Sequence, residues 1–338
     1  MSTIELQNLT FGYGAEPVIA DLSLRIADGE RHAILGASGA GKSTLLNLLS
    51  GLLTPDSGHI LFDGEAVERL RPGARQLTQV FQFPVLYESL NVRENLLFAL
   101  RHSGKLDAVA EAHVLEIVQE LDLTSRLDLK PRSLDLYQKQ LVAVAKAIVR
   151  TDTRLVLLDE PLTAVDPKRK WQMRQVITRV QQKFGLTMIY VTHDQTEAMA
   201  FADRVSVLTQ AGIAQTGAPD ALYASPASPF VGHFVGSPGM NFVPGECFHV
   251  DADLVGFRAG WAELTGPEST RCDLRGLVRE VRLSRTRQGK ALGLVFIETP
   301  TGEIAIEGPE CEVGAEVGVY VRRLALYSQD RLAQVYDR

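Results

Sequence analysis

The chain has 338 residues, a length that suits about two domains and gives each of them room for a sizeable core. Hydrophobic residues make up 45% of the chain and charged residues 22%, so a disordered or low-complexity protein is excluded. The formal net charge of -6 argues against a protein whose main task is to hold nucleic acid.

Nothing in the sequence indicates export, a metal framework or a membrane span. Cys247, Cys272 and Cys311 are widely separated and lack disulfide or zinc-ligand spacing, which favours a reducing compartment. The first residues contain no cationic start followed by an apolar stretch, so we expect no secretion signal. The most apolar runs, residues 45–53 and 155–158, fall short of the roughly 20 residues that a spanning helix needs. Any membrane role is therefore expected to be peripheral.

Residues 1 to about 235 alternate strand-like and helix-like segments, as in a βα protein. We predict strands at residues 18–26, 31–35, 60–62, 155–158 and 187–192, and helices at 42–53, 108–121 and 171–184. The strands at 155–158 and 187–192 are apolar without alternation, which indicates burial on both faces. The expected fold class is therefore α/β, with a largely parallel sheet covered by helices on both sides.

The amino-acid composition changes between residues 225 and 245, where Pro, Gly and Ser become frequent. We place the boundary near Pro238, which gives a first domain at 1–235 and a second at 236–338. The second contains short apolar runs separated by Gly, Pro and charged turns, which predicts a small β-barrel or sandwich. These runs are residues 277–281, 292–298, 303–306 and 316–321.

A phosphate-binding loop of the pattern G-x-x-x-x-G-K-[ST] follows the predicted strand at 31–35 and precedes a predicted helix. The loop comprises Gly36, Ala37, Ser38, Gly39, Ala40, Gly41, Lys42, Ser43 and Thr44. Its glycines let backbone N–H groups surround a β-phosphate, and the helix N-terminus adds a favourable dipole. Lys42 is expected to reach the β- and γ-phosphates, and Ser43 to be a ligand of Mg²⁺.

Two adjacent carboxylates end the buried strand at 155–158, where α/β sheets place their ligands. We expect Asp159 to hold Mg²⁺, directly or through water, and Glu160 to polarise the water that attacks the γ-phosphate. His193 ends the strand at 187–192 and is a candidate hydrogen-bond partner of the γ-phosphate.

Together these motifs resemble the nucleotide-binding subunit of an ABC transporter, and the match covers most of the chain. The resemblance implies that Tyr13 stacks on adenine and that Gln82 contacts the magnesium ion and the attacking water. It also implies that residues 162–166, which retain the aspartate of the family, form a loop at a dimer interface. The implied substrate is ATP and the implied cofactor is Mg²⁺.

Three further segments, residues 91–96, 191–198 and 236–242, are similar to the maltose and glycerol-phosphate importer branch of that family. That branch has a C-terminal OB-like regulatory domain, in agreement with the β-rich second domain. The implied partners are a second ATPase subunit, two transmembrane permease subunits and a periplasmic or lipoprotein solute-binding protein. The implied location is the cytoplasmic face of the inner membrane. Residues 83–90 would receive a helix of the permease, and the cargo would be a sugar, glycerol or glycerol phosphate.

One motif departs from the family. The signature Leu-Ser-Gly-Gly-Gln, which contacts the γ-phosphate bound to the opposite subunit, is replaced by Leu-Asp-Leu-Tyr-Gln at residues 134–138. One carboxylate, that of Asp135, about 4 Å from a phosphate charge would cost ~4 kcal/mol at an effective dielectric constant of ~20, so phosphate should be repelled. Asp135 is also a good N-cap, with Gln138 placed to complete a capping box for a helix through Ile148.

We therefore predict a heterodimer in which a different ATPase supplies the intact signature for the site that contains Lys42, Glu160 and His193. One alternative is a catalytically silent regulatory subunit of the same importer. Another is a soluble ABC ATPase of translation or DNA repair, which would be expected to have two nucleotide domains or a long coiled coil.

A basic cluster in the second domain raises the possibility of oligonucleotide binding. Its members are Arg275, Arg279, Arg282, Arg285, Arg287 and Lys290, with Glu280 as the local acid. No aromatic residue is interleaved for base stacking, so we expect a solvated face or a subunit contact and no nucleic-acid partner.

Overall fold

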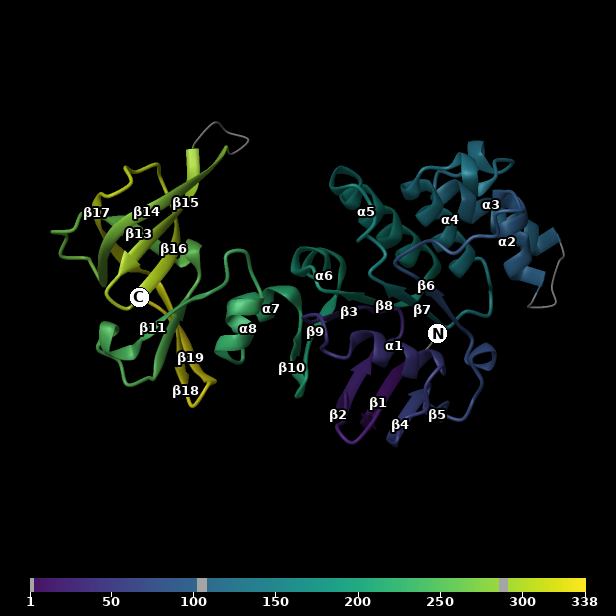
Figure 1. The fold of residues 1–338 in the computed structure, drawn as a ribbon, viewed down its shortest axis with the longest axis horizontal. Coiled ribbons are helices and arrows are strands. Elements are labelled where there is room, and N and C mark those ends of the chain that lie inside the picture. The colour runs from purple at the N-terminus through teal and green to yellow at the C-terminus, as the bar shows by residue number, and fades with distance from the viewer. Residues whose placement is uncertain (1–2, 102–107, 286–290) are drawn as a thin grey trace. The chain divides into compact units, whose positions relative to one another are not determined.

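The computed structural model describes residues 3–101, 108–285 and 291–338, and the chain divides into two compact units, Met1–Pro219 and Asp220–Arg338 (Figure 1). Helix α8 (Pro229–Phe234), which the sequence analysis placed at the end of the first domain, belongs to the second unit. Cys247, Cys272 and Cys311 are free thiols.

The first unit is built on a six-stranded sheet in the order β10-β9-β3-β8-β7-β6. The bounds are β3 Arg31–Leu35, β6 Leu77–Val80, β7 Leu155–Asp159, β8 Thr187–Thr192, β9 Arg204–Thr209 and β10 Gly212–Gly217. The five strands from β9 to β6 run parallel and only β10 pairs antiparallel. Every residue of β8 is buried, as expected for a strand covered on both faces. The predicted α/β fold with a largely parallel sheet is confirmed.

A second sheet of the first unit was not predicted. It is antiparallel in the order β2-β1-β4-β5, with bounds β1 Ile4–Phe11, β2 Ile19–Ile26, β4 Ser57–Phe62 and β5 Glu65–Ala66. The predicted strands at 18–26 and 60–62 belong to this second sheet, as β2 and β4. Burial alternates along β2, because one face of that strand packs inward and the other meets solvent.

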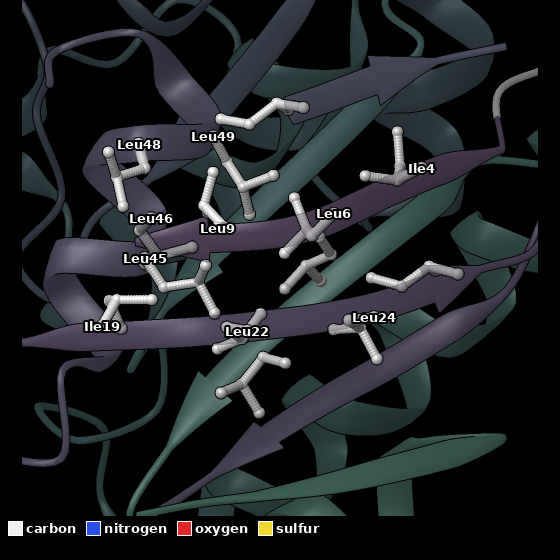
Figure 2. Close-up of a cluster of buried hydrophobic side chains, with 14 of the residues drawn as sticks. Ile4, Leu6, Leu9, Ile19, Leu22, Leu24, Leu45, Leu46, Leu48 and Leu49 are labelled. Carbon is white, nitrogen blue, oxygen red and sulfur yellow. The ribbon is translucent and has the colours of Figure 1, made fainter. Parts of the chain in front are cut away.

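Helix α1 (Lys42–Ser50) follows the phosphate-binding loop and packs on this antiparallel sheet. Figure 2 shows its leucines beside the inward side chains of β1 and β2. The buried residues include Leu45, Leu48, Leu6 and Leu22, each at most 2% exposed. At ~25 cal/mol per Å² of buried apolar surface, each such side chain contributes about 2 kcal/mol. The core therefore fixes the helix whose first turn presents the loop.

The remaining helices of the first unit include a helical subdomain. It contains α2 (Val92–Arg101), α3 (Ala108–Glu120) and α4 (Leu136–Ile148), which lie beside one another in Figure 1. Two further helices, α5 (Pro167–Phe184) and α6 (Gln195–Phe201), follow strands β7 and β8 of the parallel sheet.

The second unit is rich in β-structure, as predicted. Its strands form a four-stranded antiparallel sheet, β11-β12-β18-β19, and a five-stranded one, β13-β17-β14-β15-β16. The bounds are β11 Asn241–Pro244, β12 Leu254–Phe257, β13 Ala262–Thr265, β14 Leu274–Arg285, β15 Ala291–Thr299, β16 Gly302–Gly308, β17 Glu316–Val321, β18 Arg323–Ser328 and β19 Arg331–Asp337. One hydrophobic core contains residues from both sheets, such as Phe257 and Ile297. Helices α7 (Pro219–Ala224) and α8 precede these strands.

The basic cluster of the second unit is partly neutralised within its sheet. Arg279 forms an ion pair with Glu298 of the neighbouring strand, and Arg282 pairs with Glu280 at 2.7 Å. Arg287 and Lys290 lie outside the described residues. Within the sequence only Glu280 lies among these basic residues; strand pairing adds Glu298 as a second acid, which agrees with a solvated face.

A buried arginine joins the helices of the second unit to its sheet. Arg258 is 1% exposed, and its guanidinium donates to the carbonyls of Tyr223 (3.0 Å), Gly232 (2.7 Å) and Val235. It also lies over the Tyr223 ring, 4.2 Å from the centroid. Burial lowers the pKa of Arg258, and the carbonyls replace the water that the charge has lost.

We expect Arg258→Met to destabilise the second unit by ~3 kcal/mol, because three carbonyls lose their donor in a dry interior. Thermal or denaturant unfolding of the purified chain measures this loss. Arg275→Met, which changes a solvent-exposed arginine of the same unit, is the control and should leave the transition in place. Equal stability of the two variants would contradict the structural role of Arg258.

Candidate functional site

Four neighbouring parallel strands end at one edge of the sheet, and each is followed by residues that the sequence singled out. The phosphate-binding loop follows β3, His193 follows β8, Asp159 and Glu160 end β7, and Gln82 lies two residues beyond β6. The order β3-β8-β7-β6 therefore brings the candidate residues to the carboxyl edge, where α/β proteins bind their ligands.

The phosphate-binding loop has a backbone that only glycine suits at two positions. Gly41, the N-cap of α1, has φ 91°, in the left-handed region. A Cβ at Gly36 would lie 2.6 Å from the carbonyl oxygen of Leu208. Gly36 also donates its N–H to the carbonyl of Thr192 at 3.4 Å, so the loop is attached to the end of β8. These constraints hold the N–H groups of the loop near the start of α1. Backbone N–H groups at a helix N-terminus form a favourable site for an anion.

Lys42 is a buried cation inside this loop. Its ammonium donates to the carbonyls of Gly36 and Ala37, both at 2.9 Å. Burial lowers the pKa of Lys42, whereas the charges of Glu160 and Asp159 raise it. A phosphate chain would restore the electrostatic stabilisation that burial removes, as expected for a phosphate-binding lysine.

The residues expected to hold Mg²⁺ fit a hard cation. Burial, together with the adjacent charge of Glu160, raises the pKa of Asp159, while Lys42 opposes this shift. A divalent cation near Asp159 would stabilise its ionised form, and the exposed Ser43 hydroxyl in the first turn of α1 adds a neutral oxygen. Oxygen donors of this kind suit Mg²⁺, which usually keeps several waters and takes phosphate oxygens as further ligands.

Glu160 is held in an uncommon backbone conformation by hydrogen bonds on both its backbone and its side chain. Its φ is 44°, in the left-handed region that is uncommon for non-glycine residues. Its N–H donates to Val191 of β8 at 2.9 Å. One carboxylate oxygen lies 2.9 Å from Nδ1 of His193, and the other accepts from the hydroxyl of Thr163 at 3.0 Å. The carboxylate orientation is thus fixed from two sides.

His193 is half-exposed, and its contact with Glu160 determines what its ring can do. Because Nδ1 faces a carboxylate, Nδ1 is the donor and, in the neutral ring, Nε2 is an acceptor. The ring can donate from Nε2 to a phosphate oxygen only when both nitrogens carry protons. With Nδ1 engaged by Glu160, Nε2 is the ring nitrogen left to contact a phosphate oxygen.

Tyr13 and Gln82, whose roles rest on resemblance, both lie at this site. The Tyr13 ring is 67% exposed, with its hydroxyl 3.5 Å from that of Thr44 in the first turn of α1. It is therefore placed beside the loop with a free face for stacking. Gln82 follows Phe81, whose carbonyl accepts a 3.0 Å hydrogen bond from Gln140 of α4. The loop that carries Gln82, called the glutamine loop below, is thus attached to the helix that begins with the altered signature.

The altered signature forms the predicted capping box. Asp135 accepts from the N–H of Gln138 at 2.8 Å, and the Gln138 side chain accepts from the N–H of Asp135 at 3.0 Å. The second carboxylate oxygen of Asp135 is 2.7 Å from Arg169 of α5, which also lies over the Tyr137 ring. Hydrogen bonding to Gln138 and the charge of Arg169 lower the pKa of Asp135 despite its partial burial.

Arg169 changes the physical argument about the altered signature. The expected repulsion of ~4 kcal/mol assumed an isolated carboxylate, whereas the Asp135–Arg169 pair has no net charge. The remaining obstacles to phosphate binding at this segment are steric and directional. Leu136 and Tyr137 replace glycines that allow close approach of the backbone, and the capping box already uses the N–H of Gln138.

Thr163 was expected only as part of the dimer-interface loop at 162–166, not as a partner of Glu160, and Arg169 had no expected role. Thr163 lies three residues after Glu160 in a turn closed by a 3.1 Å backbone hydrogen bond from Thr163 to Glu160, and this spacing was the available signal. Arg169 lies 34 residues beyond Asp135, so only the packing of α4 against α5 brings the two together.

Comparison with known proteins agrees with this geometry. The ABC transporter family model matches residues 19–163. The sn-glycerol-3-phosphate import ATP-binding protein UgpC of Ruegeria sp. (strain TM1040) is 43% identical over 79% of this chain and 74% of its own length. The maltose/maltodextrin import ATP-binding protein MalK of Salmonella typhimurium is 41% identical over 72% of this chain and 66% of its own.

Solved structures give the same answer for the fold. CbiO1 from Clostridium perfringens, part of the ABC transporter complex cbiONQ, matches with a TM-score of 0.61 and 28% identity over 65% of this chain and 89% of its own. No helix in residues 3–101, 108–285 and 291–338 is both long and apolar enough to cross a membrane. The chain therefore belongs to the ABC transporter family and is an ATP-binding ATPase of that family.

Proposed function

We propose that this chain hydrolyses ATP to drive an importer of a sugar, glycerol or glycerol phosphate. The observation that carries the proposal is the convergence of the phosphate-binding loop, Asp159, Glu160 and His193 on the ends of three neighbouring parallel strands. The names of UgpC and MalK refer to import of glycerol 3-phosphate and maltose, which supports this cargo class.

In the proposed mechanism each residue has a separate task. The loop N–H groups and Lys42 bind the β- and γ-phosphates, and Ser43 and Asp159 would hold Mg²⁺, which would neutralise phosphate charge. Tyr13 stacks on adenine. Glu160 orients and polarises the attacking water, Gln82 would contact that water and the metal, and His193 holds a γ-phosphate oxygen. General-base catalysis of this kind typically contributes ~10²–10⁴-fold to the rate.

The altered signature supports a heterodimer as the working form. In it, Lys42, Glu160 and His193 of this chain act with an intact signature from a non-identical second ATPase. The other composite site, which would use Asp135, Leu136 and Tyr137, is weak or silent. The capping box and the bulky side chains are the features that support this asymmetry.

An apolar groove beside the glutamine loop supports coupling to a permease. Val85 and Tyr87 line it together with Phe98 of α2, and Lys146 of α4 lies 4.4 Å from the Tyr87 ring centroid. Phe83 is 67% exposed at the same loop. An amphipathic helix of a permease would bury these side chains. We place the chain at the cytoplasmic face of the inner membrane, with two permeases and a periplasmic or lipoprotein solute-binding protein as partners.

The alternative is a catalytically silent subunit of the same importer, which the altered signature favours. Against it stand the hydrogen-bonded Glu160–His193 pair and the buried Lys42, which a subunit that only occupies space would not need.

The proposal is tested by ATP binding and by ATP-driven uptake in vesicles that contain the assembled importer. We expect Lys42→Met to weaken ATP binding by about 100-fold, because a charge-assisted phosphate contact and its desolvated partner are lost. Uptake should fall in parallel at limiting ATP. Unchanged ATP affinity in the variant would contradict the assignment of the loop.

A further inference from the structure

A buried carboxylate that the proposed mechanism does not use contacts Thr192, the residue that precedes His193. The Glu197 side chain of α6 is 2% exposed and accepts three hydrogen bonds. Its Oε1 accepts from the Lys170 ammonium at 2.8 Å, and its Oε2 accepts from the hydroxyls of Tyr190 (2.8 Å) and Thr192 (3.3 Å). Burial and the Glu197 charge raise the pKa of Tyr190 well above its usual range, so Tyr190 remains a donor. The group is thus a satisfied polar network in a dry interior.

This network holds the chain on both sides of His193. The hydroxyl of Thr192, which precedes His193, accepts from the N–H of Asp194 at 2.9 Å and donates to Glu197. Asp194, which follows His193, caps α6 through the N–H of Thr196 at 2.8 Å. His193 therefore lies in the short connection between β8 and α6. Hydrogen bonds of Thr192 and Glu197 fix the two ends of this connection.

Lys170 connects this arrangement to another part of the chain. It lies in the first turn of α5, where its N–H donates to the carbonyl of Asp166, the N-cap, at 3.1 Å. The preceding residue, Arg169, pairs with Asp135 at the start of α4. Arg169 and Lys170 are adjacent in the first turn of α5 but contact different parts of the chain. Arg169 contacts the start of α4, and Lys170 contacts Glu197 beside the connection that carries His193.

We infer that Lys170 and Glu197 are positioning residues of His193: their ion pair holds the imidazole against Glu160 and ties it to the first turn of α5. The inference rests on the proposed role of Glu160 and His193 in hydrolysis. Neither Lys170 nor Glu197 touches the reacting atoms. Their loss misplaces the histidine, so it lowers kcat and leaves ATP affinity, which depends on the loop, nearly unchanged.

The test uses the importer assembled from its own subunits, with hydrolysis measured at steady state and in a single turnover. We expect Lys170→Met and Glu197→Gln each to lower kcat by about 10-fold with less than a twofold change in KM, and the double variant to be no worse than either. In a His193→Ala background, Lys170→Met should add no further loss, because the residue that it positions is gone. Lys170→Arg, which keeps the charge and the donors, should restore most of the activity.

Lys183→Met is the matched control, since it removes an ion-paired lysine from the other end of the same helix. Its kcat should equal that of the unaltered complex. Thermal unfolding identifies any variant that fails to fold. Glu197 is buried, so Glu197→Gln could unfold the chain; Lys170 is 24% exposed, and its substitution then carries the test. Loss of activity that is independent of His193, or full activity in Lys170→Met, would overturn the inference. An unaltered complex without hydrolysis would instead refute the proposed function.

Discussion

Glu160→Gln is expected to lower ATP hydrolysis by the assembled importer at least ~100-fold while ATP affinity stays within twofold. The amide keeps the size of the side chain and still accepts a hydrogen bond from Thr163, but it cannot take a proton from water. The contacts of Lys42 with its loop do not involve Glu160, so nucleotide binding is retained. Hydrolysis and nucleotide titrations on the same preparation separate the two effects.

The control for this variant is Glu30→Gln. Glu30 is also a carboxylate hydrogen-bonded to a histidine, His32, at 2.7 Å, but it lies at the start of β3, away from the carboxyl edge of the sheet. Hydrolysis by that variant should remain close to normal. Full transport by the Glu160→Gln importer would identify the chain as the silent subunit of the alternative.

Repair of the signature is expected to give this chain activity on its own. The triple change Asp135→Ser, Leu136→Gly and Tyr137→Gly should raise hydrolysis by the purified chain, at concentrations that allow dimers, by about 100-fold. Serine keeps an N-cap for α4, and the two glycines let the backbone N–H groups approach the phosphate of the opposite subunit. The dependence of the rate on the square of the concentration would show that dimers are responsible.

Asp135→Ser alone separates charge from shape. It removes the carboxylate and frees Arg169 but leaves Leu136 and Tyr137 in place, so we expect less than a tenth of the gain of the triple change. A single variant as active as the triple one would mean that the carboxylate, despite its ion pair, is what blocks the site.

The sequence predicted those parts of the site that are local in the chain. The loop at residues 36–44, the strand ending at Asp159 and the capping box at Asp135 each need fewer than ten consecutive residues to be recognised. Short-range steric and hydrogen-bonding rules are sufficient for them. The parallel sheet was predicted from uninterrupted apolar runs, because such runs are expected in strands that are buried on both faces.

Long-range features could not be predicted in this way. The antiparallel sheet pairs β1 with β4, about 50 residues apart, and nothing in either strand specifies its partner. Arg169 beside Asp135 and Lys170 beside Glu197 depend on where α5 packs. That packing changed one physical argument: the signature remains altered, but its acid is neutralised, so the proposed weakness of this site rests on geometry and not on charge.

The asymmetry of the working dimer is tested most directly by steady-state ATP hydrolysis of the purified chain, alone and mixed with the second ATPase subunit of the same importer. Alone, the chain should bind ATP and turn over at no more than about 1% of the rate of the mixture, whatever its concentration. In the mixture, Lys42→Met in this chain should abolish nearly all turnover, because the only site with an intact signature is lost. A lone chain that hydrolyses ATP as fast as the mixture would contradict the two-subunit account.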